Sequence, residues 1–488
     1  MTQTSSNPTT RDSRWAALIV LCTGMLMIVL DMTIVNVALP AIQNDLGFSQ
    51  SSLAWVVNAY LIAFGGLLLL AGRLGDLIGR KRIFLIGLGV FTVASILCGV
   101  SGSPEMLIAA RFVQGVGGAM ATAVTLGMIV TMFPEPGEQA RAIGVFSFVA
   151  AAGASVGLLA GGVLTQSLNW HWIFFVNIPI GIVAAVLTNR LVERDRGIGF
   201  GEGADVLGAV LVTGALMLGV YTIVKTDEHG WGSLHTIGLG ALAVAALVAF
   251  VVRQTRAANP LLPLRIFRSR NVSGANLIQI MMVAGMFGMF FLGTLYMQKV
   301  LNYSALEIGL AFLPTALAIG GLSVGLSARL ITRFGPRPVL IVGLVLILVG
   351  LVLFTRLPVG GTYFADLLPA ILLVGIGAGL SFPTLMTLAM SGATQSDAGL
   401  ASGLVNTTAQ VGGALGLAVL ATLSTARTTS QLAGGSAPAA ALTSGFHLAF
   451  GIGAVAVAVA LVLAVTLLQS QPTVAEESDE DELLADAA

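Results

Sequence analysis

Long apolar runs limit what this sequence can fold into more than any other feature. Fourteen of them follow one another along the chain, each close to the roughly 20 residues that a helix needs to cross a bilayer core. Lipid offers no hydrogen-bond partner to the backbone, so we expect helices; strands of a membrane barrel would be shorter and would alternate in polarity. The expected spans are 15–39, 52–72, 83–101, 106–132, 141–164, 171–191, 205–224, 235–252, 272–298, 305–329, 338–355, 365–390, 399–424 and 446–468.

The composition agrees with a membrane protein. Hydrophobic residues make up 56% of the chain and charged residues 9%, whereas soluble domains are about 25% charged. The formal net charge is +0, which argues against nucleic acid as a partner. Cys22 and Cys98 lie in apolar runs, so we interpret them as packing residues rather than metal ligands or a disulfide. The first run is too long for a signal peptide.

Basic residues fix the expected orientation. An even number of spans puts both termini on one side of the membrane. With a cytoplasmic N-terminus, eighteen of the 23 Lys and Arg residues fall inside, four fall outside, and Arg111 lies within a span. Cytoplasmic loops carry this kind of excess. We therefore expect both termini in the cytoplasm of a multi-pass plasma-membrane protein, with an acidic, disordered tail at 471–488.

One segment recurs in the second half of the chain. Residues 71–82 are AGRLGDLIGRKR, and residues 327–338, 256 positions later, are SARLITRFGPRP. Both segments follow the second span of a group of six, and repeated halves are common in transporters. The sequence therefore predicts an all-α membrane protein with a six-helix bundle at 12–196, two inserted helices at 197–260 and a second six-helix bundle at 261–470.

Two ionisable residues lie deep in the expected spans, Asp31 and Arg111. An ionisable group inside a membrane is costly, which makes it a functional candidate. Both residues are expected at similar depths below the outer surface, so they can share a cavity or form a pair. Burial favours the neutral carboxyl of Asp31 and a nearby arginine favours the carboxylate, so Asp31 could load and release a proton. A purely structural ion pair is the alternative.

Polar and soft side chains could line a cavity. Met282 and Met286, with Met289, share a helix face beside Phe287, Phe290 and Phe291, which would suit varied apolar substrates or simple packing. The polar candidates for the cavity could instead make interhelical hydrogen bonds. They are Asn58, Tyr60, Gln114, Asn276, Gln279, Asn406 and Gln410.

The loop sequence GRLGDLIGRKR at 72–82 resembles the cytoplasmic loop motif of the major facilitator superfamily. Small residues at Gly72 and Gly75 allow two helices to approach closely. The resemblance implies that Asp76 faces the positive N-terminus of the helix that starts near Pro338, as a conformational gate. The residues assigned to this gate are Gly72, Arg73, Gly75, Asp76, Gly79 and Arg80.

Three further stretches resemble the fourteen-span drug:proton antiporters of the EmrB/QacA type. They are LDMTIVNVALP at 30–40, RFVQGVGG at 111–118 and GASVGLLAGG at 153–162. The third resembles the fifth-helix antiporter motif, here represented by Gly153, Gly157, Gly161 and Gly162. That motif usually carries proline where this chain has Leu158, which leaves the bending of this helix open.

The resemblance implies proton-coupled export of small hydrophobic or cationic compounds by alternating access. A proton-coupled uptake carrier or a lipid flippase on the same fold is the alternative. An enzyme is not expected, because the four histidines map near the outer surface and no cluster of metal ligands is evident. An ATP-driven pump would need a GxxxxGK[ST] motif, which is absent. We expect no cofactor and no metal, a monomer, and the substrate, protons and lipid as partners.

Overall fold

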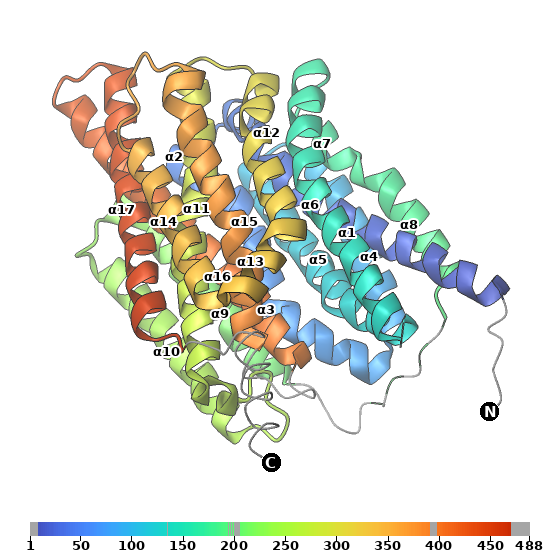
Figure 1. The fold of residues 1–488 in the computed structure, drawn as a ribbon. Coiled ribbons are helices and arrows are strands. Elements are labelled where there is room, and N and C mark those ends of the chain that lie inside the picture. The colour runs from blue at the N-terminus through green and yellow to red at the C-terminus, as the bar shows by residue number, and fades with distance from the viewer. Residues whose placement is uncertain are drawn as a thin grey trace, which may run out of the picture. The chain divides into compact units, whose positions relative to one another are not determined.

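The computed structural model describes residues 8–133, 135–193, 195, 197, 199, 205–390 and 398–469. These residues form helices and contain no strand (Figure 1). The chain divides into two compact units, one formed by residues 1–222 and 234–262 and the other by 223–233 and 263–488. The predicted acidic tail, 471–488, lies outside the described residues.

The first unit contains the helices drawn from blue to green in Figure 1, and most of the inserted pair belongs to it. Two expected spans are each divided into a short helix and a long one, α2 with α3 and α7 with α8. The helices are α1 (Pro8–Leu46), α2 (Gln50–Leu53), α3 (Trp55–Ile78), α4 (Arg80–Gly99), α5 (Pro104–Met132), α6 (Pro136–Ser167), α7 (Trp172–Phe175), α8 (Asn177–Leu191), α9 (Val206–His229) and α10 (Leu234–Arg256).

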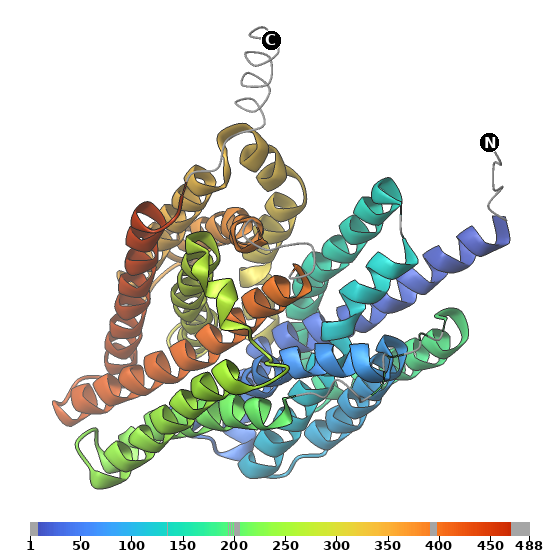
Figure 2. The same ribbon diagram turned by 90° about the horizontal axis from the view of Figure 1, so that it is seen from below.

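The second unit runs from yellow-green to red in Figures 1 and 2. Two of its expected spans contain a π-helical turn, η3 between α12 and α13 and η4 before α15. The elements are η2 (Leu264–Arg268), α11 (Arg270–Lys299), α12 (Ala305–Gly321), η3 (Leu322–Leu326), α13 (Ser327–Phe334), α14 (Pro336–Phe354), η4 (Tyr363–Leu367), α15 (Leu368–Met390), α16 (Ala398–Ala433) and α17 (Pro438–Thr466).

Twelve helices within the described residues are long and apolar enough to cross a membrane, and two shorter apolar helices, Val156–Ser167 and Ala305–Gly321, accompany them. The protein is therefore a multi-pass membrane protein. The shorter pair falls on two of the fourteen expected spans, 141–164 and 305–329.

The first helix is longer than the sequence suggested. The expected span stopped before Pro40, but α1 continues to Leu46 with Pro40 inside it. A proline inside a helix removes one backbone hydrogen bond, and neighbouring helices can compensate for this loss in a membrane protein. Asp31 consequently lies fifteen residues, or about 22 Å, from the end of α1, whereas the predicted span ended only eight residues after it.

Glycines bring the helices of the first unit into backbone contact. A Cβ placed on Gly115 of α5 would lie 2.5 Å from the Tyr60 carbonyl oxygen of α3. A Cβ on Gly117 would lie 2.5 Å from the Phe91 backbone nitrogen of α4. Such close packing is typical of small residues in membrane helices. It holds α3 and α4 against the part of α5 that carries Arg111.

The repeated segment forms the same corner in both units. Gly79 has φ 105° and separates α3 from α4, and Gly335 has φ 79° and separates α13 from α14. Each glycine N–H donates to the carbonyl four residues earlier, Gly75 in one unit and Ile331 in the other. A positive φ is accessible to glycine at little cost, so the repeat conserves a helix–turn–helix corner.

Candidate functional site

The side chain of Asp31 is at the centre of a buried polar cluster in the first unit. Its Oδ2 accepts from Arg111 Nη1 at 2.5 Å. Its Oδ1 accepts from Gln114 Nε2 at 2.7 Å and from Asn177 Nδ2 at 2.9 Å. The exposed fraction of these four residues is 0–1%. These three donors occupy both oxygens of the carboxylate.

Arg111 is fixed by several further contacts. Its Nε donates to the Val56 carbonyl of α3 at 2.9 Å, and its Nη1 also reaches Gln114 Oε1 at 2.6 Å. The guanidinium carbon lies 4.4 Å from the centre of the Tyr60 ring and 5.8 Å from that of Phe174. Cation–π contacts of this kind stabilise a desolvated guanidinium. The sequence-predicted proximity of Asp31 and Arg111 is thus present, while their role in coupling stays a prediction.

Ser95 of α4 closes the cluster. Its hydroxyl accepts from Gln114 Nε2 at 2.8 Å and from Asn177 Nδ2 at 3.4 Å, and it donates to the Phe91 carbonyl. Cys98 donates its thiol to Gln114 Oε1 at 3.6 Å. Residues from α1, α3, α4, α5 and α8 therefore meet at one point, and a change in the charge of Asp31 acts on all of them.

The glycines of the predicted antiporter motif lie against α1 on either side of Asp31. A Cβ on Gly157 would lie 2.0 Å from Thr33 Oγ1 and 2.9 Å from the Leu30 carbonyl oxygen. A Cβ on Gly161 would lie 2.8 Å from the Ile34 carbonyl oxygen, and one on Gly153 would lie 3.0 Å from Leu26 Cδ1. Gly162 is buried as well. This row of glycines allows α6 to pack directly on the segment that carries Asp31.

The gate motif is organised around Arg80 at the start of α4. Arg80 forms an ion pair with Asp76 at 3.1 Å and donates to the Gly127 carbonyl and to Thr131 Oγ1 at the end of α5. A Cβ on Gly75 would lie 2.4 Å from Val124 Cγ1. Gly72 has more room, and Arg73 is half-buried. Asp76 is half-exposed at this corner.

Asp195 and Lys81 connect this corner to the end of α8. The Asp195 carboxylate accepts from the backbone N–H groups of Arg80 at 2.5 Å and Lys81 at 3.1 Å, and so caps α4. Lys81 is buried, and its Nζ donates to the Asn189 and Val192 carbonyls. The repeat has prolines at 336 and 338 in place of Arg80 and Arg82, and prolines have no N–H to cap.

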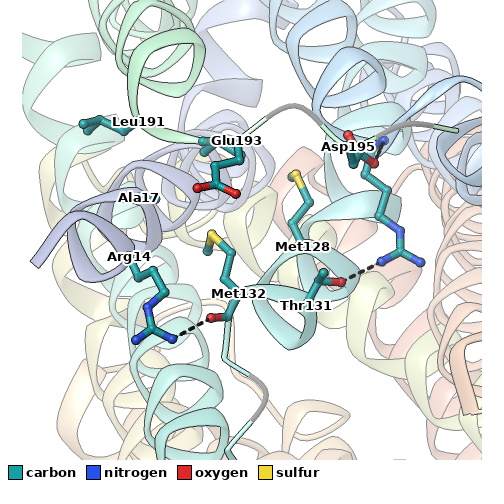
Figure 3. A pocket seen from close by; sticks show the side chains of 10 residues that line it. Arg14, Ala17, Met128, Thr131, Met132, Leu191, Glu193 and Asp195 are labelled. Atoms are coloured by element: carbon teal, nitrogen blue, oxygen red, sulfur yellow. Dashed lines mark hydrogen bonds between the residues drawn. The ribbon is translucent and has the colours of Figure 1, made fainter. Parts of the chain in front are cut away.

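A cavity of about 300 Å³ lies beside this corner, lined by the ends of α1, α5 and α8 (Figure 3). Arg14 donates to the Met132 carbonyl at 3.4 Å on one side. The Met128 and Met132 side chains point into the space between Arg14 and Asp195, and Glu193 lies at its edge (Figure 3). The cavity carries charges of both signs and has no role in the sequence predictions.

The polar candidates of the second unit are only partly connected. Asn276 donates to the Val272 carbonyl and accepts from Thr408 Oγ1 at 2.9 Å, which joins α11 to α16. Gln279 is buried and Gln410 half-buried, and their Oε1 atoms contact no donor among the described residues. Asn406 is exposed. In the first unit, both amide atoms of buried Asn58 and the Tyr60 hydroxyl likewise have no described partner.

The methionine stripe lies in the packed part of α11. Met282, Met286 and Met289 are at most 3% exposed. The ring centroids of Phe290 and Phe312, in the same unit, lie 5.2 Å apart. These contacts fit the packing alternative at least as well as a substrate wall.

Sequence reasoning missed Asn177, Ser95 and Asp195. Asn177 and Ser95 each stand in an apolar run, where a single polar residue is usually satisfied by its own helix or by one neighbour. The signal that could have identified Asn177 is the residue type, because an amide cannot satisfy all its groups within its own helix. Asp195 lies in a loop and carries no comparable signal.

Comparison with known proteins gives one consistent result. The Major Facilitator Superfamily model matches residues 21–417. Puromycin resistance protein pur8 of Streptomyces alboniger is 41% identical over 473 residues, 95% of this chain and 93% of that protein. Cephamycin export protein CmcT of Amycolatopsis lactamdurans is 40% identical, covering 83% and 84%. The tetracenomycin C resistance and export protein of Streptomyces glaucescens is 37% identical, covering 86% and 77%.

Solved structures agree on the fold. A bacterial homologue of the human lysosomal transporter Spinster matches with a TM-score of 0.66 at 15% identity, covering 93% of this chain and 98% of that one. The nucleoside transporter NupG matches with a TM-score of 0.64 at 11% identity, covering 93% and 100%. At these identities the likeness concerns the fold alone.

Proposed function

The chain belongs to the major facilitator superfamily, and from this premise we propose that it exports small hydrophobic or cationic compounds in exchange for protons, by alternating access. Export of small compounds follows from relatives that share most of its length and are named for puromycin resistance, cephamycin export, and tetracenomycin C resistance and export. A cargo of antibiotic type is the corresponding proposal for this chain.

Proton coupling rests on one observation, the buried cluster around Asp31. A proton carrier needs a group that changes its charge inside the membrane barrier, and Asp31 is the deep carboxylate of the sequence. In the geometry described, Arg111 and two amides donate to both of its oxygens. Binding a proton to Asp31 releases Arg111 from its counter-charge, and this change is available to drive a rearrangement of the helices that contribute to the cluster.

The glycine row of α6 links that change to helix movement. Because Gly157 and Gly161 lie against the backbone of α1 beside Asp31, a shift of α1 on protonation requires α6 to move with it or to slide past it. Packed helices have few intermediate arrangements, so this contact supports a switch between discrete states.

Fourteen spans are also part of the proposal. The helix α6 has 32 residues, and α12 continues through η3 into α13 from residue 305 to residue 334. At 1.5 Å per residue each is about 45 Å long, more than the roughly 30 Å of a bilayer core. We propose two six-helix bundles at 12–196 and 261–470 with the inserted pair at 197–260, both termini in the cytoplasm and the plasma membrane as location.

The gate and the substrate cavity complete the proposal. Asp76, with Arg80 and the glycines of the motif, is the candidate cytoplasmic gate. The candidate cavity residues are those with polar atoms that lack a described partner, chiefly Asn58, Gln279 and Gln410. Their amide groups can bind varied polar substituents of a cargo.

The experiment uses everted membrane vesicles from cells that produce the protein, with puromycin as the probe. Acidifying the vesicle interior is expected to drive puromycin inward, and a protonophore is expected to abolish its accumulation. Vesicles without the protein are the control. Accumulation that survives collapse of the pH gradient would contradict proton coupling, and accumulation only in right-side-out vesicles would indicate an uptake carrier instead.

A further inference from the structure

Asn177 is the one residue of the Asp31 cluster contributed by α8. It is the first residue of that helix, directly after α7 and Val176. Its side chain is completely buried, and its Nδ2 donates to Asp31 Oδ1 at 2.9 Å and, more weakly, to Ser95 Oγ at 3.4 Å. Its nitrogen faces Asp31 in the structure, and an ionised carboxylate offers only acceptor atoms to a neighbouring amide.

The other half of the Asn177 amide is unsatisfied. The carbonyl oxygen, Oδ1, is buried and contacts no hydrogen-bond donor among the described residues. A buried amide oxygen without a donor is costly, and native structures usually provide a partner for it. A partner that is missing in one state of a transporter can be supplied in another.

Protonated Asp31 would supply that partner. The neutral carboxyl has an O–H group that needs an acceptor. Gln114 Oε1 is already occupied by Arg111 Nη1, and Ser95 Oγ already accepts from Gln114. Of the two amides that donate to Asp31, Asn177 is the one whose carbonyl oxygen has no donor among the described residues, and a half-turn of this amide brings that oxygen to Asp31 Oδ1.

We propose that Asn177 is a positioning residue that binds Asp31 in both protonation states by turning its amide. With Asp31 ionised, Nδ2–H donates to Oδ1. When a proton binds to Oδ1, the amide rotates and its carbonyl oxygen accepts the new O–H bond, while Ser95 keeps its bond from Gln114. The proposal shares one premise with the proposed function, namely that Asp31 binds a proton, and does not require that this proton drives transport.

The surroundings of Asp31 leave few other groups that could titrate with it. Arg111 faces it from α5, with the Tyr60 ring of α3 on the guanidinium, and Cys98 of α4 reaches Gln114. The helix α8 contributes the neutral amide alone to the cluster, within the described residues. Asn177 therefore changes the energies of the two states through hydrogen bonds, and no charge is added or removed with it.

The test is infrared titration of the purified full-length protein in lipid, which detects the protonated carboxyl of Asp31 without any substrate. The band is assigned by its loss in Asp31→Asn. In Asn177→Leu, which has neither donor nor acceptor, the carboxylate loses a charge-assisted bond and the neutral form loses a weaker one. The midpoint of the band is therefore expected to rise by about one pH unit, and the band itself is expected to shift to the frequency of a less hydrogen-bonded carboxyl.

Two further variants keep the result interpretable. Thr188 lies on the same helix, eleven residues after Asn177, and its buried hydroxyl has no partner among the described residues. Thr188→Val removes this hydroxyl and should leave both the midpoint and the frequency of the band unchanged. Asn177→Gln retains the amide, so its midpoint should lie between those of the unmodified protein and Asn177→Leu. If Asn177→Leu does not fold, Asn177→Gln takes its place. An unchanged midpoint and frequency in Asn177→Leu would overturn the proposal, as would an equal shift in Thr188→Val. If these bands behave as expected but Asp31→Asn still transports uphill, the proposed function fails and this inference stands.

Discussion

Gly157→Ala tests the packing of α6 on α1 beside Asp31. The added Cβ would lie 2.0 Å from Thr33 Oγ1 and 2.9 Å from the Leu30 carbonyl oxygen, whereas ordinary contacts begin at 3.4 Å. Thr33 can turn away only by giving up its bonds to the Val29 and Leu30 carbonyls. The backbone of α1 must then retreat by about half an ångström. Over-packing of this kind costs about 1–3 kcal/mol.

Two measurements on the purified protein check this prediction, thermal unfolding in detergent and the initial rate of export after reconstitution. We expect Gly157→Ala to unfold at a lower temperature and to transport more slowly. The matched control is Gly89→Ala in the middle of α4, where a Cβ meets no atom within 4 Å and should leave stability equal or raise it by up to about 1 kcal/mol. The reasoning is refuted if both variants unfold and transport like the unmodified protein.

Three other changes have defined outcomes. Asp195→Ala removes the cap of α4 and should lower stability by about 0.5–2 kcal/mol in thermal unfolding, whereas Asp195→Asn should lose less because it keeps one acceptor. Asp205→Ala removes the carboxylate that joins Arg253 and Gln254 of α10 to the start of α9, and should cost about 1.5–3 kcal/mol by the same measurement; no loss would mean that this cluster does not stabilise the inserted pair. Asp76→Asn keeps the shape of the gate and removes the charge that a helix N-terminus would favour by about 0.3–1 kcal/mol, so the export rate should fall, and an unaltered rate would exclude the gate role.

The sequence predicted the elements of this protein better than their ends. Apolar runs identify membrane helices because a bilayer imposes a minimum length on them. The extension of α1 past Pro40 was not predictable, because proline breaks helices in water while membrane helices tolerate it. The short helices α2 and α7 were not predicted as separate elements. Each is separated from the following long helix by a single residue, and such a break leaves the apolar run in the sequence uninterrupted.

The charged residues of the candidate site were predictable from the sequence, whereas its uncharged polar residues were predicted only in part. Asp31 and Arg111 stand out because charges are rare and costly within a span. Asn177 and Ser95 were not singled out, because the cost of a buried amide or hydroxyl is small enough for such residues to occur singly in many spans. Only the three-dimensional arrangement shows that two helices, α5 and α8, place their polar groups on one carboxylate of α1. The same holds for Asp195, whose partner N–H groups are more than 110 residues away in the sequence.

The central claim is that Asp31 carries the coupling proton. The most direct measurement compares the unmodified protein with Asp31→Asn in proteoliposomes that have an imposed pH gradient and contain puromycin as the probe. Asparagine keeps the size and much of the hydrogen bonding but cannot bind a proton at neutral pH. We predict that the variant still exchanges puromycin at equal pH on both sides, but no longer moves it uphill when the gradient is imposed. Uphill transport by Asp31→Asn at the rate of the unmodified protein would contradict the account.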